Sequence, residues 1–117
     1  MLSAAAPNRA MNVAYASGVA TSSAQDKTKT ASDDSSTPSA TTAATTQANE
    51  AAFGQVGFVT TGFMESSGYT TLSRITVGTV TFSAAFRILS ATGAQTYAPT
   101  LATSQQWNET LVTLKSA

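Results

Sequence analysis

The amino-acid sequence predicts a mainly β protein, in which a small antiparallel sandwich or barrel (about 53–117) is preceded by an extended, largely non-regular N-terminal arm. Residues 20–52 contain no Val, Ile, Leu, Met, Phe, Trp or Tyr, whereas residues 53–117 hold eight of the nine aromatic residues and six of the seven glycines. In the second region, apolar residues recur at every second position, which is the period of a half-buried strand.

These observations divide the chain into an arm at residues 1–52 and a β module at residues 53–117. Without large apolar side chains, residues 20–52 bury too little surface to offset a backbone ordering entropy of about 1–2 kcal/mol per residue. We expect this Ser-, Thr- and Ala-rich stretch to be disordered alone and to lie extended across neighbouring subunits. At most it contains a short helix around residues 40–52, where the sequence reads "TTAATTQANEAA" after position 40.

The first half of the β module predicts two β-rich runs separated by a turn. Glycines bracket the run at 54–63, and "ESSG" at 65–68 has turn chemistry. Gly78 and Thr79 interrupt the second run, 69–89, as either a two-residue hairpin turn or a bulge in one long strand. The clearest strand follows them, because apolar residues alternate strictly at Val80, Phe82, Ala84, Phe86 and Ile88.

The second half of the module predicts two more strands after a turn at 90–95. Pro99 has no N–H to donate to a ladder, so "TYAPTLAT" reads as an edge-like strand. "WNETLVTLK" at 107–115 predicts the last strand. The core of five or six such strands is thin, and no disulfide can support it, so we expect extra stability from oligomerisation or docking.

Composition and charge exclude several classes of function. Six basic and six acidic side chains give a net charge of zero, so we expect neither nucleic acid nor a membrane as partner. The chain has no Cys and no His, which removes thiol nucleophiles, thiolate metal sites and the commonest general base. We expect no cofactor and no metal. The scattered apolar residues near Met1 predict no signal peptide, and no window approaches the about 18–20 apolar residues of a membrane-spanning helix.

The carboxylates do not form a recognisable catalytic or metal-binding pattern. Three aspartates lie in the predicted arm without the spacing of a calcium loop, and we interpret them as a solvated acidic patch: Asp26, Asp33 and Asp34. Three glutamates flank or lie within the β region, and we expect them on the surface instead of paired in a glycosidase cleft: Glu50, Glu65 and Glu109. No residue is therefore assigned a catalytic role.

Four residues are candidates for contact with a partner. Trp107 has a large ring and an N–H that needs an acceptor, so it suits an anchor in the core or at an interface. Arg74 and Arg87 are the cations in the middle of the β region, and either could pair with a carboxylate across an interface or face solvent and discourage edge aggregation. Tyr97, in the edge-like strand, completes the set.

The sequence as a whole predicts a non-enzymatic structural component of a large assembly. In composition and layout it resembles small accessory proteins of viral particles, such as the capsid decoration or cement proteins and tail proteins of bacteriophages. This resemblance implies a virion location, an arm lying across neighbouring subunits, and other protein subunits as partners in a homo-oligomer, on a scaffold protein, or both. The alternative is an extracellular or cell-surface fibre or adhesin-like β module with a Ser/Thr-rich stalk.

Overall fold

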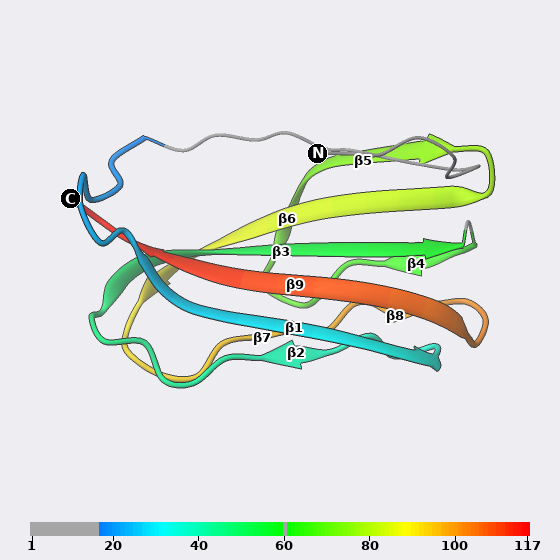
Figure 1. Ribbon diagram of the computed structural model, residues 1–117, viewed down its shortest axis with the longest axis horizontal. Coiled ribbons are helices and arrows are strands. Elements are labelled where there is room, and N and C mark those ends of the chain that lie inside the picture. The colour runs from blue at the N-terminus through cyan, green and yellow to red at the C-terminus, as the bar shows by residue number, and fades with distance from the viewer. Residues whose placement is uncertain (1–16, 60) are drawn as a thin grey trace.

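A five-stranded antiparallel sheet, with strand order β1-β9-β3-β6-β5, is the main element of the computed structural model, which describes residues 17–59 and 61–117 (Figure 1). Its strands are β1 (Gln25–Ser35), β3 (Asn49–Val59), β5 (Thr70–Val77), β6 (Val80–Ser90) and β9 (Gln105–Lys115). Every neighbouring pair is antiparallel. The predicted mainly β fold is confirmed.

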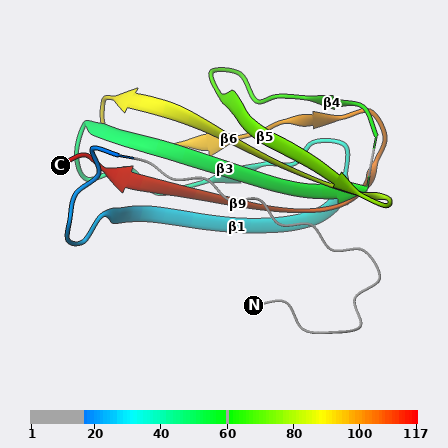
Figure 2. The same ribbon diagram turned by 90° about the horizontal axis from the view of Figure 1, so that it is seen from above.

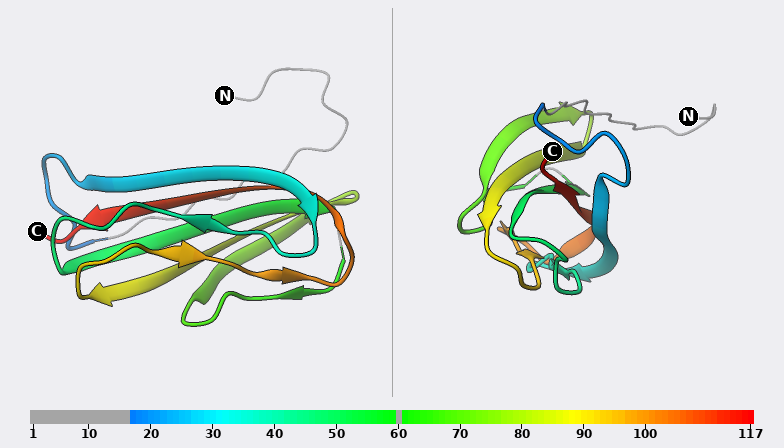
Figure 3. Two further views of the ribbon diagram at one scale, coloured as in Figure 1. Left: turned by 90° about the horizontal axis from the view of Figure 1, so that it is seen from below. Right: turned by 90° about the vertical axis from the view of Figure 1, so that its left-hand side faces the viewer.

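A second, thinner layer covers one face of this sheet. It consists of two short strand pairs, β2 (Ala40–Thr41) with β7 (Thr96–Tyr97), and β4 (Phe63–Met64) with β8 (Thr100–Leu101). Figure 2 shows β4 in a layer separate from the main sheet, and the left panel of Figure 3 shows the short strands lying over one face of the sheet. The end-on panel of Figure 3 shows that the main sheet is curved. The architecture is therefore sandwich-like, with one complete sheet and one fragmentary layer.

The hydrophobic core lies between these two layers. The sheet contributes Ala52, Val56, Phe58, Ala85, Leu89, Trp107 and Leu111, the covering layer contributes Ala40, Tyr97 and Leu101, and the turn before β5 contributes Tyr69. We call this covered side of the main sheet the inner face and the opposite side the outer face. Tyr97 is 0% exposed and stacks edge-on against Tyr69, with ring centroids 4.9 Å apart.

Two predicted turns are confirmed. Val77 pairs directly with Val80, so Gly78–Thr79 is a two-residue hairpin turn and not a bulge. Gly78 has a φ of 60°, which glycine adopts without strain at the first central position of a II′ turn. In the turn at 65–68, the Tyr69 N–H donates to the Ser66 carbonyl at 3.1 Å.

The prediction of an arm up to residue 52 is wrong for the part that the structure describes as strand. Residues 25–35 form β1, which pairs with β9, and residues 49–52 begin β3 in the middle of the sheet. The short helix around 40–52 is also wrong, because β2 and the start of β3 occupy that stretch. Residues 1–16 of the predicted arm lie outside the described residues.

Main-chain pairing explains why β1 forms although it has no large apolar side chain. It is an edge strand, and its backbone groups bond to β9 while most of its Thr, Ser and charged side chains remain in water. Composition predicts disorder for a segment that must build its own core. Composition does not predict whether a polar segment will pair, as an edge strand, with a sheet whose core is formed by other strands.

Gly54 is required where Tyr97 packs against the inner face. A Cβ at this position would stand 2.5 Å from Cγ of the Tyr97 ring. We expect Gly54→Ala to lower the free energy of unfolding by about 2 kcal/mol, because the core must shift to relieve the overlap. Urea unfolding followed by circular dichroism measures this.

Gly57→Ala is the matched control on the same strand. Its Cβ would meet only the end of the Asn108 side chain, at 3.0 Å on the outer face, and that side chain can rotate away. We expect a clearly smaller loss of stability. Equal losses for the two variants would mean that close packing of Tyr97 is not the reason for a glycine at position 54.

Candidate docking surface

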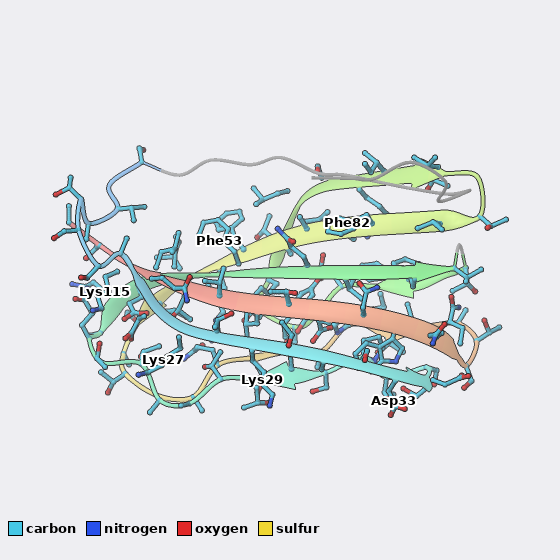
Figure 4. The ribbon with its side chains drawn as sticks, viewed as in Figure 1. Lys27, Lys29, Asp33, Phe53, Phe82 and Lys115 are labelled. Carbon is cyan, nitrogen blue, oxygen red and sulfur yellow. The ribbon has the colours of Figure 1, made fainter. Side chains whose placement is uncertain are left out.

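The outer face of the main sheet carries a continuous apolar patch. Directly opposed residues on antiparallel strands share a face, so the pairings Phe53–Phe86, Phe53–Val112 and Ile75–Phe82 place these side chains together. We define the outer-face patch as Phe53, Val59, Leu72, Ile75, Val77, Val80, Phe82, Phe86, Ile88, Val112 and Leu114. Figure 4 shows Phe53 and Phe82 along β3 and β6 within this patch.

The outer face is the more apolar side of the sheet, although no described strand covers it. The inner-face positions of the strands hold the large apolar residues Val56, Phe58, Leu89, Trp107 and Leu111, and they also bury Glu50, Thr81, Ser83, Glu109 and Thr113. On the outer face, Ile88 is 69% exposed and Val59 is 49% exposed. Monomeric soluble proteins seldom leave so large an apolar patch open unless it serves as a contact surface.

One end of the patch is hollowed into a groove of about 510 Å³. Its apolar lining from the sheet consists mainly of Phe53, Leu72, Phe86, Ile88 and Leu114. Ser17, Gly18 and Val19 line it as well, held at the end of β9 by the bridge between Val19 and Ser116. The groove can accept apolar side chains from a partner.

The four residues predicted as interface candidates do not lie on the outer face. Trp107 is 5% exposed on the inner face, and its Nε1–H donates to Ser35 Oγ at 3.0 Å. Tyr97 lies in the covering layer, where its hydroxyl donates to Glu65 Oε1 at 2.7 Å. Both side chains are therefore enclosed by residues of the same chain.

The two arginines also project from the inner side of the sheet. Arg74 is paired in register with Ser83, and its guanidinium carbon stands 4.3 Å above the ring of Phe63. Arg87 is exposed and paired in register with Ala52, and its guanidinium lies beside Gly68. The structure brings neither cation near the outer-face patch.

A buried acidic group lies under the covering layer. Glu109 is 2% exposed, and its carboxyl oxygens have no hydrogen-bond partner among the described residues. Burial, with a smaller effect from the nearby Glu65 charge, raises the pKa of Glu109 to about 8. Glu65 itself accepts hydrogen bonds from the hydroxyls of Tyr97 and Thr71 and from the Ser66 N–H.

A second acidic pair lies near the end of β3. Burial and the neighbouring Asp26 raise the pKa of Glu50, which is 3% exposed. Burial also acts to raise the pKa of Asp26, but hydrogen bonds, including those from the Thr46 N–H and hydroxyl at 2.6 and 2.8 Å, lower it to about 2.

The prediction that the glutamates lie on the surface is thus wrong for Glu50 and Glu109, which are buried. The prediction that the aspartates form a solvated acidic patch is wrong for Asp26, whose side chain is 4% exposed. The physical reason is strand register. Positions 50 and 109 have the same inward phase as Val56 and Leu111 on their own strands. Asp33 and Asp34 are exposed, as expected.

Within residues 17–59 and 61–117, no group of three or more His, Cys, Asp or Glu side chains is placed to hold a metal ion. The same residues contain no helix long and apolar enough to cross a membrane. Sequence reasoning missed the outer-face patch, although its signal was the alternation of Val80, Phe82, Phe86 and Ile88. No protein-family model, no curated protein and no solved structure matches this chain.

Proposed function

We propose that this protein is a non-enzymatic structural component of a large protein assembly, and that it joins the assembly through the outer-face patch. The observation that carries the proposal is the inversion of the two faces. Five polar side chains of the main sheet are buried on its inner face. Most of the large apolar side chains of the same sheet lie on its outer face, which no described strand covers.

Burial of this patch supplies the binding free energy in the proposed role. Full burial of a Val, Leu, Ile or Phe side chain is worth about 1.5–3 kcal/mol relative to leaving it exposed. Ile88 is mostly exposed, and Phe53, Phe82 and Phe86 are half-buried, so a covering partner gains part of that amount at each position. The function is passive, since it requires contact and not chemistry.

Within this class, we propose a virion accessory protein of the bacteriophage type, such as a capsid decoration, cement or tail protein. The small size of the chain, a charged fraction of only 10% and a sequence rich in Thr, Ser and Ala support this choice.

An Ile88→Lys substitution tests the docking role of the outer face. Ile88 is 69% exposed, so the variant should fold normally, with a change in the free energy of unfolding within about 0.5 kcal/mol. We expect it to lose association of the full chain, measured by light scattering over a range of protein concentrations. Its monomeric fraction should also bind less of a hydrophobic dye than the wild-type monomer does.

Ala94→Lys is the control. Ala94 is exposed in the loop between β6 and β7, so this substitution adds the same charge away from the outer face. It should behave as the wild type. If Ile88→Lys and the wild type associate equally and bind dye equally, the outer face is not a docking surface.

The location is tested with antibodies raised against the chain. We expect them to label extracellular particles purified from the source and to detect the protein in those particles by mass spectrometry. Label on the cell surface would instead favour the fibre or adhesin-like alternative. Protein found only in the soluble fraction of the cell would contradict both locations.

A further inference from the structure

We propose that the partner of the outer-face patch is the same patch on a second copy of this chain, so that two main sheets stack face to face as a closed sandwich dimer. This inference rests on the proposed docking role and adds the identity of the partner. Stacked sheets lie about 10 Å apart with their side chains interdigitated.

The size of the face suits a dimer. Five strands about 4.8 Å apart, and up to about 11 residues long at about 3.3 Å per residue, give a face of roughly 20 by 35 Å, or about 700 Å² per copy. A standard stable interface buries about 800 Å² on each partner. One face against one face therefore reaches the usual size without a third subunit.

The charge distribution allows the face to meet itself. From β9 to β5, no outward-facing strand position carries a charged side chain, and the charged residues that line the end groove, Glu50 and Lys115, occupy inward-facing positions paired with each other. In Figure 4 the labelled Lys27, Lys29 and Asp33 lie along β1, away from Phe53 and Phe82. The outward side chains of β1 are Thr28, Thr30 and Ser32, which form a polar rim, and the exposed Asp34 near one end of the strand. A twofold axis across the strands places the two Asp34 side chains at opposite ends of the interface, so two copies can stack without bringing these like charges together.

The positions of the groove and of the apolar side chains on the outer face favour one arrangement of the two copies. The groove with Phe53, Leu72 and Ile88 lies at one end of the strands, and the apolar side chains near the β5–β6 hairpin, including Val80 and Phe82, lie at the other end. A twofold axis between the sheets and across the strands places the hairpin end of each copy over the groove of the other. Such an interface is isologous, as in most homodimers.

This arrangement puts the middle of β3 next to the axis. Gln55 is exposed on the outer face there, opposite Ala84 on one neighbouring strand and Thr110 on the other. Its symmetry mate would face it across the gap between the sheets. The chain has no cysteine, so a single engineered thiol reports one position without background.

The experiment uses the full chain carrying Gln55→Cys and a short bifunctional thiol cross-linker, because sheets about 10 Å apart leave two thiols that point toward each other across the gap only a few ångströms apart. We expect a cross-linked dimer in high yield and a wild-type mass of two chains by size exclusion with light scattering. Adding Ile88→Lys should halve that mass and abolish the cross-link. Ala94→Cys, exposed in a loop off the outer face, should give several-fold less cross-linked product.

Three results would overturn the inference, and they separate it from the proposed function. A wild-type monomer that still binds hydrophobic dye through the Ile88 region would refute the dimer and leave a different protein as the docking partner. A monomer that binds no dye and whose Cys at position 55 does not react would refute both, because the outer face would then be inaccessible within a single chain. A dimer that cross-links through Ala94→Cys and not through Gln55→Cys would refute the face-to-face arrangement.

Discussion

Glu109→Gln is expected to stabilise the protein at neutral pH by about 3 kcal/mol, since one pKa unit corresponds to about 1.4 kcal/mol. The pKa of Glu109 rises from an ordinary value of 4.5 to about 8 on folding, chiefly because the carboxyl is buried. At pH 7 the folded chain holds a proton that the unfolded chain has released. Gln is neutral in both states, so it does not require this proton uptake.

The sign of the pH dependence follows from the same shift. Between pH 4.5 and about 8 the folded state binds more protons at Glu109 than the unfolded state does, so this group lowers stability as the pH rises. The difference between Glu109→Gln and the wild type should be small at pH 4, grow through that window and level off above it. Urea unfolding at a series of pH values measures the difference directly.

Asp33→Asn is the control for Glu109→Gln, because it removes a carboxylate that is exposed on β1. Surface substitutions of this kind usually change stability by less than about 0.5 kcal/mol. If Glu109→Gln gave the same stability change at pH 4 as at pH 8, its carboxyl would not titrate in the window that its burial implies.

Trp107→Ala is expected to lower the free energy of unfolding by about 3–5 kcal/mol, the usual cost of removing a buried Trp. The side chain is 5% exposed, packs in the core with Phe58 and Leu111, and donates its N–H to Ser35. In a small domain whose total stability is about 5–15 kcal/mol, this loss is a large fraction. Circular dichroism must follow the unfolding, because Trp107 is the only tryptophan.

Two further variants separate the contributions at this position. Trp107→Phe keeps an aromatic ring and removes the hydrogen bond to Ser35, so we expect a smaller loss than for Trp107→Ala. Gln106→Ala alters the exposed neighbour on the outer side of β9 and should leave stability almost unchanged. A small effect of Trp107→Ala would show that the residue contributes to an interface more than to this core.

The strands of the β module were predictable because their signals are local. The alternation from Val80 to Ile88 defines β6, and Gly78 supplies the positive φ of the hairpin before it. Both features depend on the residues themselves and on their immediate neighbours. The prediction of a single edge-like strand around Pro99 is wrong, because Pro99, which lacks a backbone N–H, separates β7 from β8, and these pair with different strands.

β1 was not predictable by the same reasoning, because its stability comes from β9. Sequence composition identified Gln25–Ser35 as unable to form a core, and the structure agrees that its side chains do not form one. Long-range main-chain pairing, from Gln25 with Leu114 to Ser35 with Gln105, holds it instead. Almost any residue can make backbone hydrogen bonds to a neighbouring strand. The side chains of β1 therefore contain no local pattern that predicts this strand.

The candidate docking surface also depends on long-range structure and not on local sequence. Trp107 and Tyr97 were chosen for the size and chemistry of their side chains, and they lie in the core. The outer-face patch gathers moderate apolar residues from β3, β5, β6 and β9, which are far apart in the chain. Such a patch becomes visible only when strand order and register are known.

The sequence by itself determined that this chain forms antiparallel strands, where most of them turn, and which residues alternate from one side of each strand to the other. Only the tertiary structure decided which of the two sides is covered. A period of two assigns residues to opposite faces but does not say which face is inside. The segments containing β2, β4, β7 and β8 cross one face, so Glu50 and Glu109 are buried while Ile88 is left in water.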